Sequence, residues 1–405
     1  MELVSPETVG LDSRQLARVG EHLRRAYLEP GKIPGFVTLV ARAGRPCYLD
    51  VAGQRDIVRG EAMTSDTVFR IYSMTKPITS LALMTLHERG LFSLDDPVHR
   101  FIPEFRDIRV RKAGAFPLFE TVPCARPMTI RDLLTHTSGL TYDFLRESNI
   151  DYAYRKLQVG NPQPGYTLKD MIVQLAQLPL EFSPGQRWNY SLGVDVCGYL
   201  IEVMSGKSLP EYLEEVLFRP LGMVDTTFNV RPEQVSRLAS CYERNAHKEL
   251  VMNDDGRATQ FQNREFHSGG GGLLSTVADY YRFCQMLQNG GTLDGQRIIG
   301  SRTLDYMIRN HLPGGVDLSQ IAIGSFSETL YEGVGFGLGF AVKLDPVANG
   351  YPATAGSFFW GGLASTLFWV DPEEDLTVLF MTQLTPSSTF NFRGQLEAMI
   401  YAALE

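Results

Sequence analysis

The spacing of hydrophobic positions changes along the chain and predicts strands near both ends. Residues 35–42 are rich in β-branched side chains, and a turn at 43–45 leads into a second apolar segment at 47–52. This arrangement predicts an antiparallel hairpin. In the last third of the chain, strand-like segments recur at 270–275, 335–342, 354–360, 364–370 and 376–381.

Helical periodicity dominates the middle of the chain. Residues 76–89 carry apolar side chains three and four positions apart, with Pro77 in the first turn and Gly90 as the C-cap. Capping residues precede several further amphipathic segments. These predicted helices begin near Asp12, Thr129, Thr167, Leu192, Ser208, Thr276, Ser301 and Phe392.

Strands at both ends with helices between them predict an α/β (α+β) fold. We expect one antiparallel sheet, flanked by helices and built from both chain ends, plus a mainly helical insertion. The 405 residues fit two domains, or one domain that carries an insertion. We therefore expect a discontinuous α/β domain from residues 1–75 and 265–405 and a mainly helical domain from 76–264. The active site is expected at their interface.

Composition and charge exclude several classes of function. Hydrophobic residues make up 44% of the chain and charged residues 21%, which is ordinary for a globular protein with a large core. The formal net charge is −8 and the Lys and Arg residues are scattered, so no nucleic acid partner is expected. No segment approaches the roughly 20 apolar residues of a membrane span. The first residues lack the basic start and apolar run of a secretory signal, so we expect a cytoplasmic protein.

The cysteines and histidines do not indicate a disulfide framework or a metal site. The seven histidines show no His-x-His or His-Glu-x-x-His spacing, so no metal is expected. The cysteines are odd in number and form no Cys-x-x-Cys pair, which favours reduced, buried thiols over a nucleophile. They are Cys47, Cys124, Cys197, Cys241 and Cys284.

Ser73 and Lys76 form a Ser-x-x-Lys motif at the start of the predicted helix 76–89. Residues three apart lie on one helix face, so the hydroxyl and the amine project together. The helix N-terminus adds free N–H groups beside the hydroxyl, and a partly desolvated lysine can take its proton. By itself the tetrapeptide also fits an ordinary solvated helix start.

Other motifs narrow the class of enzyme. No Gly-x-Ser-x-Gly is present, which removes the nucleophile elbow of the α/β-hydrolase fold. The run 269–272 consists of glycines but lacks Gly-Lys-Ser/Thr and precedes a strand, so tight backbone packing beside a cleft is favoured over phosphate binding. Dinucleotide binding has no support, because no Gly-x-Gly-x-x-Gly follows a predicted strand.

A Ser-Lys enzyme also needs a second proton-transfer group, an oxyanion hole and a wall for the acyl group. Tyr190 precedes a predicted helix, where its phenol can face a cleft, although a Tyr packed at a helix entry fits the same position. Trp360, Gly361 and Gly362 end one predicted strand before another begins. Glycines there let the backbone approach an acyl group and direct an N–H at its oxygen, or simply form a tight β turn.

Together these segments resemble the penicillin-recognising serine hydrolase superfamily, which includes class C β-lactamases and D-Ala-D-Ala carboxypeptidases. The resemblance is strongest to the family VIII carboxylesterases and covers nearly the whole chain. The motifs that carry it lie at 69–77, 133–140, 182–191, 220–223 and 269–273.

The resemblance implies the fold of β-lactamases and transpeptidases, and a role for each residue of the site. Ser73 looks like the acylated nucleophile, Lys76 its partner amine, and Tyr190 the tyrosine that shares proton transfer with the lysine. The sequence leaves open which of Lys76 and Tyr190 is the formal base. The backbone N–H groups of Ser73 and Leu363 would form the oxyanion hole, and no metal or cofactor is implied.

Two departures from the β-lactamase pattern point toward esters. Trp360 stands where β-lactamases and carboxypeptidases normally carry the lysine of Lys-Thr-Gly, and an indole offers an apolar wall instead of a charge. Leu192 stands where class C β-lactamases usually have the Asn of Tyr-x-Asn, which would hold a β-lactam's amide. Weak hydrolysis of β-lactams as a side activity stays open.

Further residues are candidates for the substrate site. The segment 141–166 is expected to line or cover the cleft, with Tyr142 and Phe144 among its aromatic residues, and His267 could face the same cleft. His136 lies inside the structural motif 133–140, which favours a hydrogen-bonded structural histidine over a catalytic base.

The sequence predicts a serine carboxylesterase that hydrolyses short- to medium-chain esters through an acyl-Ser73 intermediate. Its partner is a small-molecule ester, and the oligomeric state is left open. Three alternatives stand beside it: an acyltransferase to an alcohol, a β-lactamase or D-Ala-D-Ala peptidase, and a non-catalytic binding relative.

Overall fold

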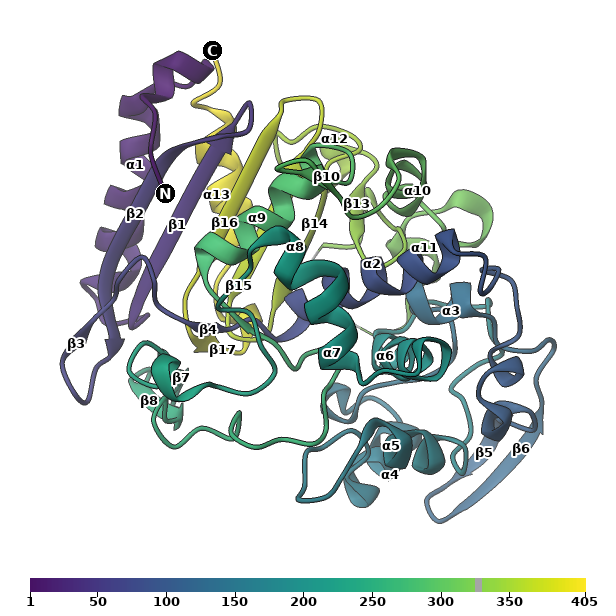
Figure 1. Ribbon diagram of the computed structural model, residues 1–405. Helices are drawn as coiled ribbons and strands as arrows, with labels where there is room; N and C mark the ends of the chain where they lie inside the picture. Colours follow the sequence, from purple (N-terminus) through teal and green to yellow (C-terminus); the bar gives the residue numbers. More distant parts are fainter. Residues whose placement is uncertain (325–329) are drawn as a thin grey trace.

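The computed structural model describes residues 1–324 and 330–405, and its centre is a large antiparallel sheet (Figure 1). Eight strands form it in the order β12-β13-β14-β15-β16-β1-β2-β3, with each strand antiparallel to its neighbours. These strands are β12 (Val334–Phe336), β13 (Ala341–Lys343), β14 (Phe358–Gly362), β15 (Thr366–Asp371), β16 (Leu376–Met381), β1 (Gly35–Arg42), β2 (Arg45–Asp56) and β3 (Glu61–Ala62). Strands from both chain ends thus pair in one sheet, which confirms the predicted fold class.

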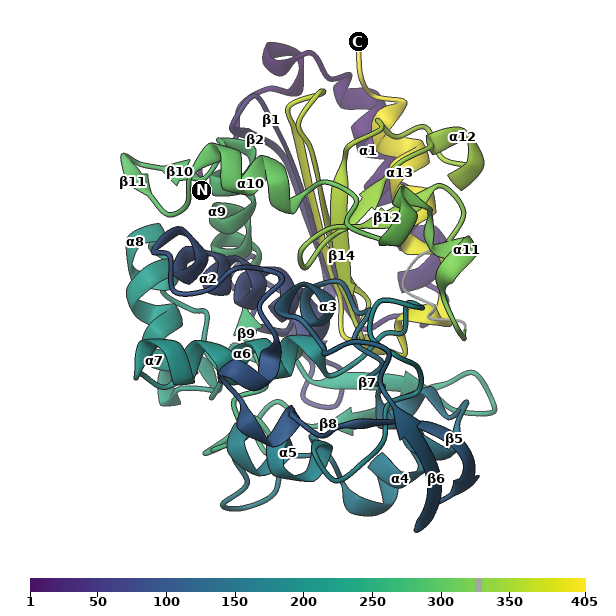
Figure 2. The same cartoon turned by 90° about the vertical axis from the view of Figure 1, so that its right-hand side faces the viewer.

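Helices cover both faces of this sheet (Figure 2). The first and last helices, α1 (Ser13–Leu23) and α13 (Phe392–Tyr401), pack against each other on one face. Helix α9 (Val277–Gln288) covers the other face, where it contacts β15 and β16. The remaining helices of this part are α10 (Ser301–Met307), α11 (Leu318–Ile321) and α12 (Pro346–Asn349).

The segment between the two halves of the sheet is mainly helical, as predicted. Its helices are α2 (Thr75–Glu88), α3 (Ile130–Leu134), α4 (Asn149–Leu157), α5 (Leu168–Leu175), α6 (Gly193–Ser205), α7 (Leu209–Leu213) and α8 (Arg219–Leu221). It also holds two hairpins that the sequence did not predict: β5 (Arg109–Ala115) with β6 (Leu118–Pro123), and β7 (Cys241–Arg244) with β8 (Leu250–Asp254). The two-domain division at residues 76 and 265 stays a proposal.

Several element ends differ from the predicted ones. The strand predicted at 335–342 is divided into β12 and β13 by a turn in which Gly339 has φ 91°, a conformation that favours glycine. The strand predicted at 270–275 is only β9 (Leu274–Ser275), which pairs with β4 (Phe69–Arg70). Short strands β10 (Thr292–Leu293), β11 (Gln296–Arg297) and β17 (Leu384–Thr385) complete the structure, and β17 runs parallel to β7. No helix in the described ranges has the length and apolar character that crossing a membrane requires.

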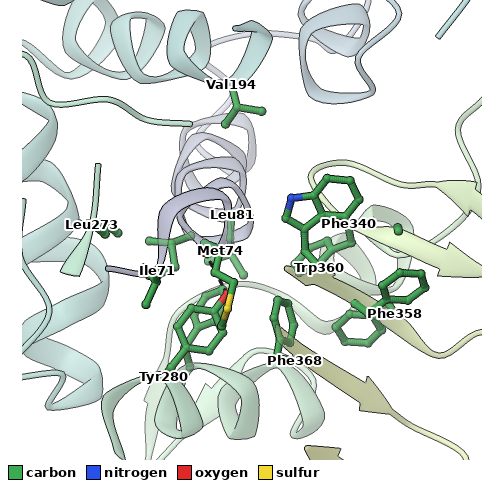
Figure 3. Close-up of a cluster of buried hydrophobic side chains, with 14 of the residues drawn as sticks. Ile71, Met74, Leu81, Val194, Leu273, Tyr280, Phe340, Phe358, Trp360 and Phe368 are labelled. Atoms are coloured by element: carbon green, nitrogen blue, oxygen red, sulfur yellow. Dashed lines mark hydrogen bonds between the residues drawn. The ribbon is translucent and has the colours of Figure 1, made fainter. Parts of the chain in front are cut away.

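Helix α2 is the most enclosed helix near the sheet. Every residue from 75 to 86 is buried, and α2 contacts α6 and α7 as well as the turn that precedes it. Tyr280 on α9 holds the start of the helix. Its Oη donates a hydrogen bond to Met74 O at 2.9 Å, and its ring packs on Phe368 of β15 (Figure 3). A helix enclosed in this way holds its first turn rigidly.

Arg70 anchors the chain just before that helix. Its side chain is fully buried and pairs with Asp254 through two nitrogens, at 2.9 Å each. The guanidinium also donates to Ala239 O and to Thr259 Oγ1, while Gln383 bonds both backbone polar groups of Arg70. One arginine therefore connects β4 with β8 and with the end of the main sheet.

Replacing this arginine should destabilise the fold measurably. Arg70→Met leaves the nearly buried Asp254 carboxylate without its ion pair, so the free energy of unfolding should fall by about 3–5 kcal/mol. Urea unfolding followed by circular dichroism measures the change. The matched control is Arg100→Met, which removes an exposed pair with Asp96 and should cost about 1 kcal/mol or less. Equal losses in the two variants would contradict this role of Arg70.

Candidate active site

The backbone around Ser73 makes a sharp change of direction between strand and helix. A short 3-10 turn, Tyr72–Met74, links β4 to α2, and Tyr72 adopts a left-handed φ of 40°. This conformation is uncommon for a side chain of that size and marks a locally strained backbone. The turn leaves Ser73 half-buried at the first turn of a buried helix.

Strand β14 lies directly against this turn. A Cβ on Gly362 would come within 2.3 Å of Ile71 O, so only a glycine allows the strand to approach so closely. The next residue, Leu363, is 36% exposed and lines the same cavity as Ser73. The close approach therefore brings the backbone expected to form the oxyanion hole next to the candidate nucleophile.

Ser73, Lys76 and Tyr190 meet within hydrogen-bond distance. Tyr190 Oη lies 2.6 Å from Ser73 Oγ, and Lys76 Nζ lies 3.3 Å from the same oxygen. Lys76 Nζ also donates to Gly270 O at 2.7 Å and lies 4.5 Å from the centre of the Tyr190 ring. Both side chains are 1% exposed. A hydroxyl between an amine and a phenol in a buried setting can lose its proton to that pair.

A buried carboxylate, which the sequence analysis did not identify, supports this group. Asp195, in the first turn of α6, accepts hydrogen bonds from Gly270 N at 3.0 Å, Tyr142 Oη at 3.3 Å and Ser268 Oγ. Burial raises the pKa of Asp195, and the nearby charge of Lys76 acts against that rise. Burial also raises the pKa of Tyr142 well above its usual value, so this phenol stays protonated and donates.

The glycine run explains how Asp195 reaches the site. A Cβ on Gly270 would come within 2.3 Å of Asp195 Oδ2 and 2.8 Å of Tyr142 Oη. The run thus packs tightly beside the cleft, as the sequence predicted, and presents one carbonyl to Lys76. The sequence signal for Asp195 was weak, because an acidic residue in a first helical turn is common without any site.

The Ser73 hydroxyl opens into a cavity of about 430 Å³. Aromatic and aliphatic side chains form most of its wall, together with a few polar residues. The lining residues include Tyr72, Tyr142, Asp143, Phe144, Leu145, Val159, Asn161, Tyr190, Leu192, Gln260, Phe261, Arg264, Phe266 and Leu363. Among the residues predicted for substrate binding, Tyr142 and Phe144 therefore lie in the cleft wall.

Other residues predicted for substrate binding lie elsewhere. Trp360 is buried behind Tyr190, with 5.7 Å between ring centres, and is not among the described lining residues. Gly361 and Gly362 line a separate cavity of about 350 Å³ beside α13. His267 packs against Phe228 at 5.2 Å, and burial lowers its pKa.

His136 lies behind the site and not beside the nucleophile. Its Nδ1 lies 3.1 Å from Ser191 Oγ, and its ring lies 4.9 Å from that of Tyr190. Complete burial holds its pKa well below the usual value, and the charge of Lys76 lowers it further. A neutral, hydrogen-bonded histidine in this place agrees with the structural role that the sequence favoured.

The cysteines offer no competing nucleophile in this cleft. All five are free thiols and four of them are buried. Burial raises the pKa of Cys47 to about 11 and of Cys241 to about 12, which keeps both protonated near neutral pH. Within residues 1–324 and 330–405, no group of three His, Cys, Asp or Glu side chains is placed to hold a metal ion.

Comparisons with known proteins agree with this geometry. A family model described as beta-lactamase matches residues 21–401. Esterase EstB from Burkholderia gladioli is 34% identical, over 94% of this chain and 93% of the relative. The structure of EstCE1, described as a hydrolase with promiscuous acyltransferase activity, is similar at a TM-score of 0.78 with 28% identity, over 96% and 98% of the two chains.

A mutant of simvastatin synthase from Aspergillus terreus, LovD9, is similar at a TM-score of 0.80 with 26% identity, again over 96% of this chain and 98% of the other. The matches extend over the main sheet and the helical segment alike. The chain therefore belongs to the beta-lactamase family, within the penicillin-recognising serine hydrolases, and lies close to the family VIII carboxylesterases.

Proposed function

We propose that this protein is a serine carboxylesterase that forms an acyl-enzyme on Ser73. The observation that carries the proposal is the position of Ser73 Oγ, within hydrogen-bond distance of both Lys76 Nζ and Tyr190 Oη in the wall of a cavity of about 430 Å³. The esterases among its relatives support an ester substrate.

The first step forms the acyl-enzyme. Ser73 Oγ attacks the ester carbonyl carbon, and its proton passes to the pair formed by Lys76 and Tyr190. The carbonyl oxygen becomes an oxyanion that the backbone N–H groups of Ser73 and Leu363 stabilise. When the tetrahedral intermediate collapses, the bond to the alcohol oxygen breaks, and the same pair returns the proton to the departing alcohol.

The second step releases the acid. A water molecule gives a proton to the Lys76 and Tyr190 pair as its oxygen attacks the acyl carbon, and that proton returns to Ser73 Oγ when its bond to carbon breaks. An alcohol in place of water would transfer the acyl group, and the acyltransferase activity named for EstCE1 supports this second candidate. The aliphatic and aromatic wall around Leu192 and Phe144 suits short to medium acyl chains.

The nucleophile can be tested directly. Ser73→Ala should abolish hydrolysis of p-nitrophenyl butyrate and covalent labelling by a fluorophosphonate, because both reactions need the hydroxyl oxygen. Absorbance at 405 nm and mass spectrometry of the intact protein measure the two effects, with Ser80→Ala on the same helix as the matched control. Normal turnover in Ser73→Ala would exclude the proposed nucleophile.

The two proton-transfer groups should be needed separately. Tyr190→Phe keeps the ring packed against His136 but removes the hydroxyl, and Lys76→Ala removes the amine. Each should lower kcat/KM for p-nitrophenyl butyrate by at least about a hundredfold, the usual scale for a positioned acid or base. Full activity of either variant would show that the removed group does not take part in proton transfer.

The balance between hydrolysis and transfer is a third test. Adding a primary alcohol should raise the rate of p-nitrophenol release if deacylation limits turnover, and chromatography should detect the new ester. We expect butyric acid to remain the main product at millimolar alcohol. A product mixture dominated by the new ester under those conditions would assign the chain to acyltransferases.

A further inference from the structure

An arginine in the wall of the cleft lacks a carboxylate partner. Arg264 lines the same cavity as Ser73, next to Gln260 and Phe261. Its Nε donates to Gln260 O at 2.6 Å, and its guanidinium carbon lies 3.7 Å from the centre of the Phe261 ring. Considering residues 1–324 and 330–405, no carboxylate lies within 4.0 Å of this guanidinium, and neither of its two terminal nitrogens donates a hydrogen bond.

Asp254, whose charge also acts on Arg264, is already paired with another arginine. Asp254 accepts from two nitrogens of Arg70, at 2.9 Å each, and from Thr259 Oγ1 at 3.1 Å. Burial lowers the pKa of Arg264 to about 10, while Tyr72 and the charge of Asp254 act against that decrease and the charge of Arg70 adds to it. Arg264 therefore stays cationic near neutral pH while it is partly removed from water, an arrangement that a bound anion would stabilise.

The guanidinium is also held in place before any ligand arrives. The hydrogen bond to Gln260 O and the contact with the Phe261 ring hold the guanidinium in place. Little side-chain entropy is therefore lost when its two terminal nitrogens bind an acceptor. Phe261 in turn contacts the ring of Tyr72, the residue before the nucleophile. This chain of contacts connects Arg264 with the residue next to Ser73.

The charge distribution in the cleft favours one position for an anion. Asp143 lines the same cavity, and its carboxylate accepts a hydrogen bond from Asn161 Nδ2 at 3.2 Å. Asp143 and Arg264 do not form an ion pair with each other, so they carry opposite charges at separate places in the wall. An anionic group is repelled near Asp143 and attracted near Arg264.

We propose that Arg264 is a specificity-determining residue and that the substrates of the cleft are esters carrying a carboxylate remote from the scissile bond. The two terminal nitrogens of the guanidinium bind the two carboxylate oxygens, a geometry that arginine favours. This inference rests on the proposed esterase function and adds the chemical class of the substrate. It locates the recognition of charge at Arg264, outside the Trp360-Gly-Gly segment.

Two matched pairs of substrates test the proposal. In the first pair the carboxylate is on the acyl side of the ester, and mono-p-nitrophenyl adipate is compared with its neutral terminal carboxamide. In the second pair it is on the alcohol side: 4-carboxyphenyl butyrate against 4-carbamoylphenyl butyrate. For at least one pair, the wild-type kcat/KM should be at least about tenfold higher for the carboxylate substrate than for the carboxamide, mainly through a lower KM. In Arg264→Met, the ratio of the two kcat/KM values should fall to about one.

The ratio within one variant does not depend on how much of the enzyme is folded. Arg302→Met, at an almost fully exposed position on α10, is the matched control and should keep the wild-type ratio. Arg264→Lys should retain part of the preference, because it keeps the charge but loses the fork, and Asp143→Asn should not reduce it. A wild-type ratio near one for both pairs, or an unchanged ratio in Arg264→Met, would overturn the proposal.

Binding to the Ser73→Ala variant separates this inference from the proposed function. Calorimetry should show tighter binding of mono-p-nitrophenyl adipate than of its carboxamide, and Arg264→Met in the same background should remove the difference. If the wild type hydrolyses p-nitrophenyl butyrate but the Ser73→Ala variant binds the carboxylate and the carboxamide equally, the Arg264 proposal is refuted and the esterase proposal stands. If the carboxylate binds more tightly but the wild type hydrolyses no ester, the esterase proposal is refuted and the binding role of Arg264 stands.

Discussion

The burial of the Lys76 amine is the constraint on which the rest of the site depends. Removing an amine from water costs several kcal/mol if it is charged, so the interior must provide replacements for hydration. Gly270 O accepts from it at 2.7 Å, and the rings of Tyr142 and Tyr190 lie 5.1 and 4.5 Å away. Each aromatic contact of this kind contributes on the order of 1 kcal/mol. Ser73 Oγ lies 3.3 Å from the same amine, so the hydroxyl that contacts the amine is also the group that we propose it activates.

The position of Gly270 O, which accepts from Lys76, depends on neighbouring residues of the fold. Gly270 O can face Lys76 only because Asp195 holds Gly270 N and Tyr142, and any larger residue at position 270 would collide with both side chains. Asp195 is itself fully buried and needs those donors, together with Ser268, to remain in place. Lys76 on α2 and Asp195 on α6 are thus linked through the two backbone polar groups of Gly270.

The sequence predicted the parts of this structure that are encoded by local patterns. Strands β1 and β16 have the predicted bounds, because buried central strands carry unbroken β-branched and apolar residues. Hairpin β5–β6 was missed, since its residues are largely exposed. Hairpin β7–β8 was missed because only two residues of β7 are buried and β8 is mostly polar or partly exposed, which is too short a signal to predict a strand. Ser73 and Lys76 share one helix, so their spacing was informative. Asp195 and Ser268 meet from segments 73 residues apart, and only the tertiary fold brings them together.

The position of Trp360 indicates a supporting role for its side chain behind the cleft. The indole is buried against Tyr190 and Phe336, so it fixes the ring of the proposed acid–base tyrosine and does not line the cavity. The neutral indole packs behind the proposed catalytic tyrosine and has no charge to pair with that of a substrate. With the proposed role of Arg264, recognition would fall to segments that line the cavity, among them 142–145, which holds a short 3-10 helix, and 260–266, which lies outside helices and strands. Tyr142 belongs both to the cavity wall and to the surroundings of Lys76, because it donates to Asp195 and its ring lies 5.1 Å from Lys76 Nζ, so the segment 260–266 has more freedom to change than the segment 142–145.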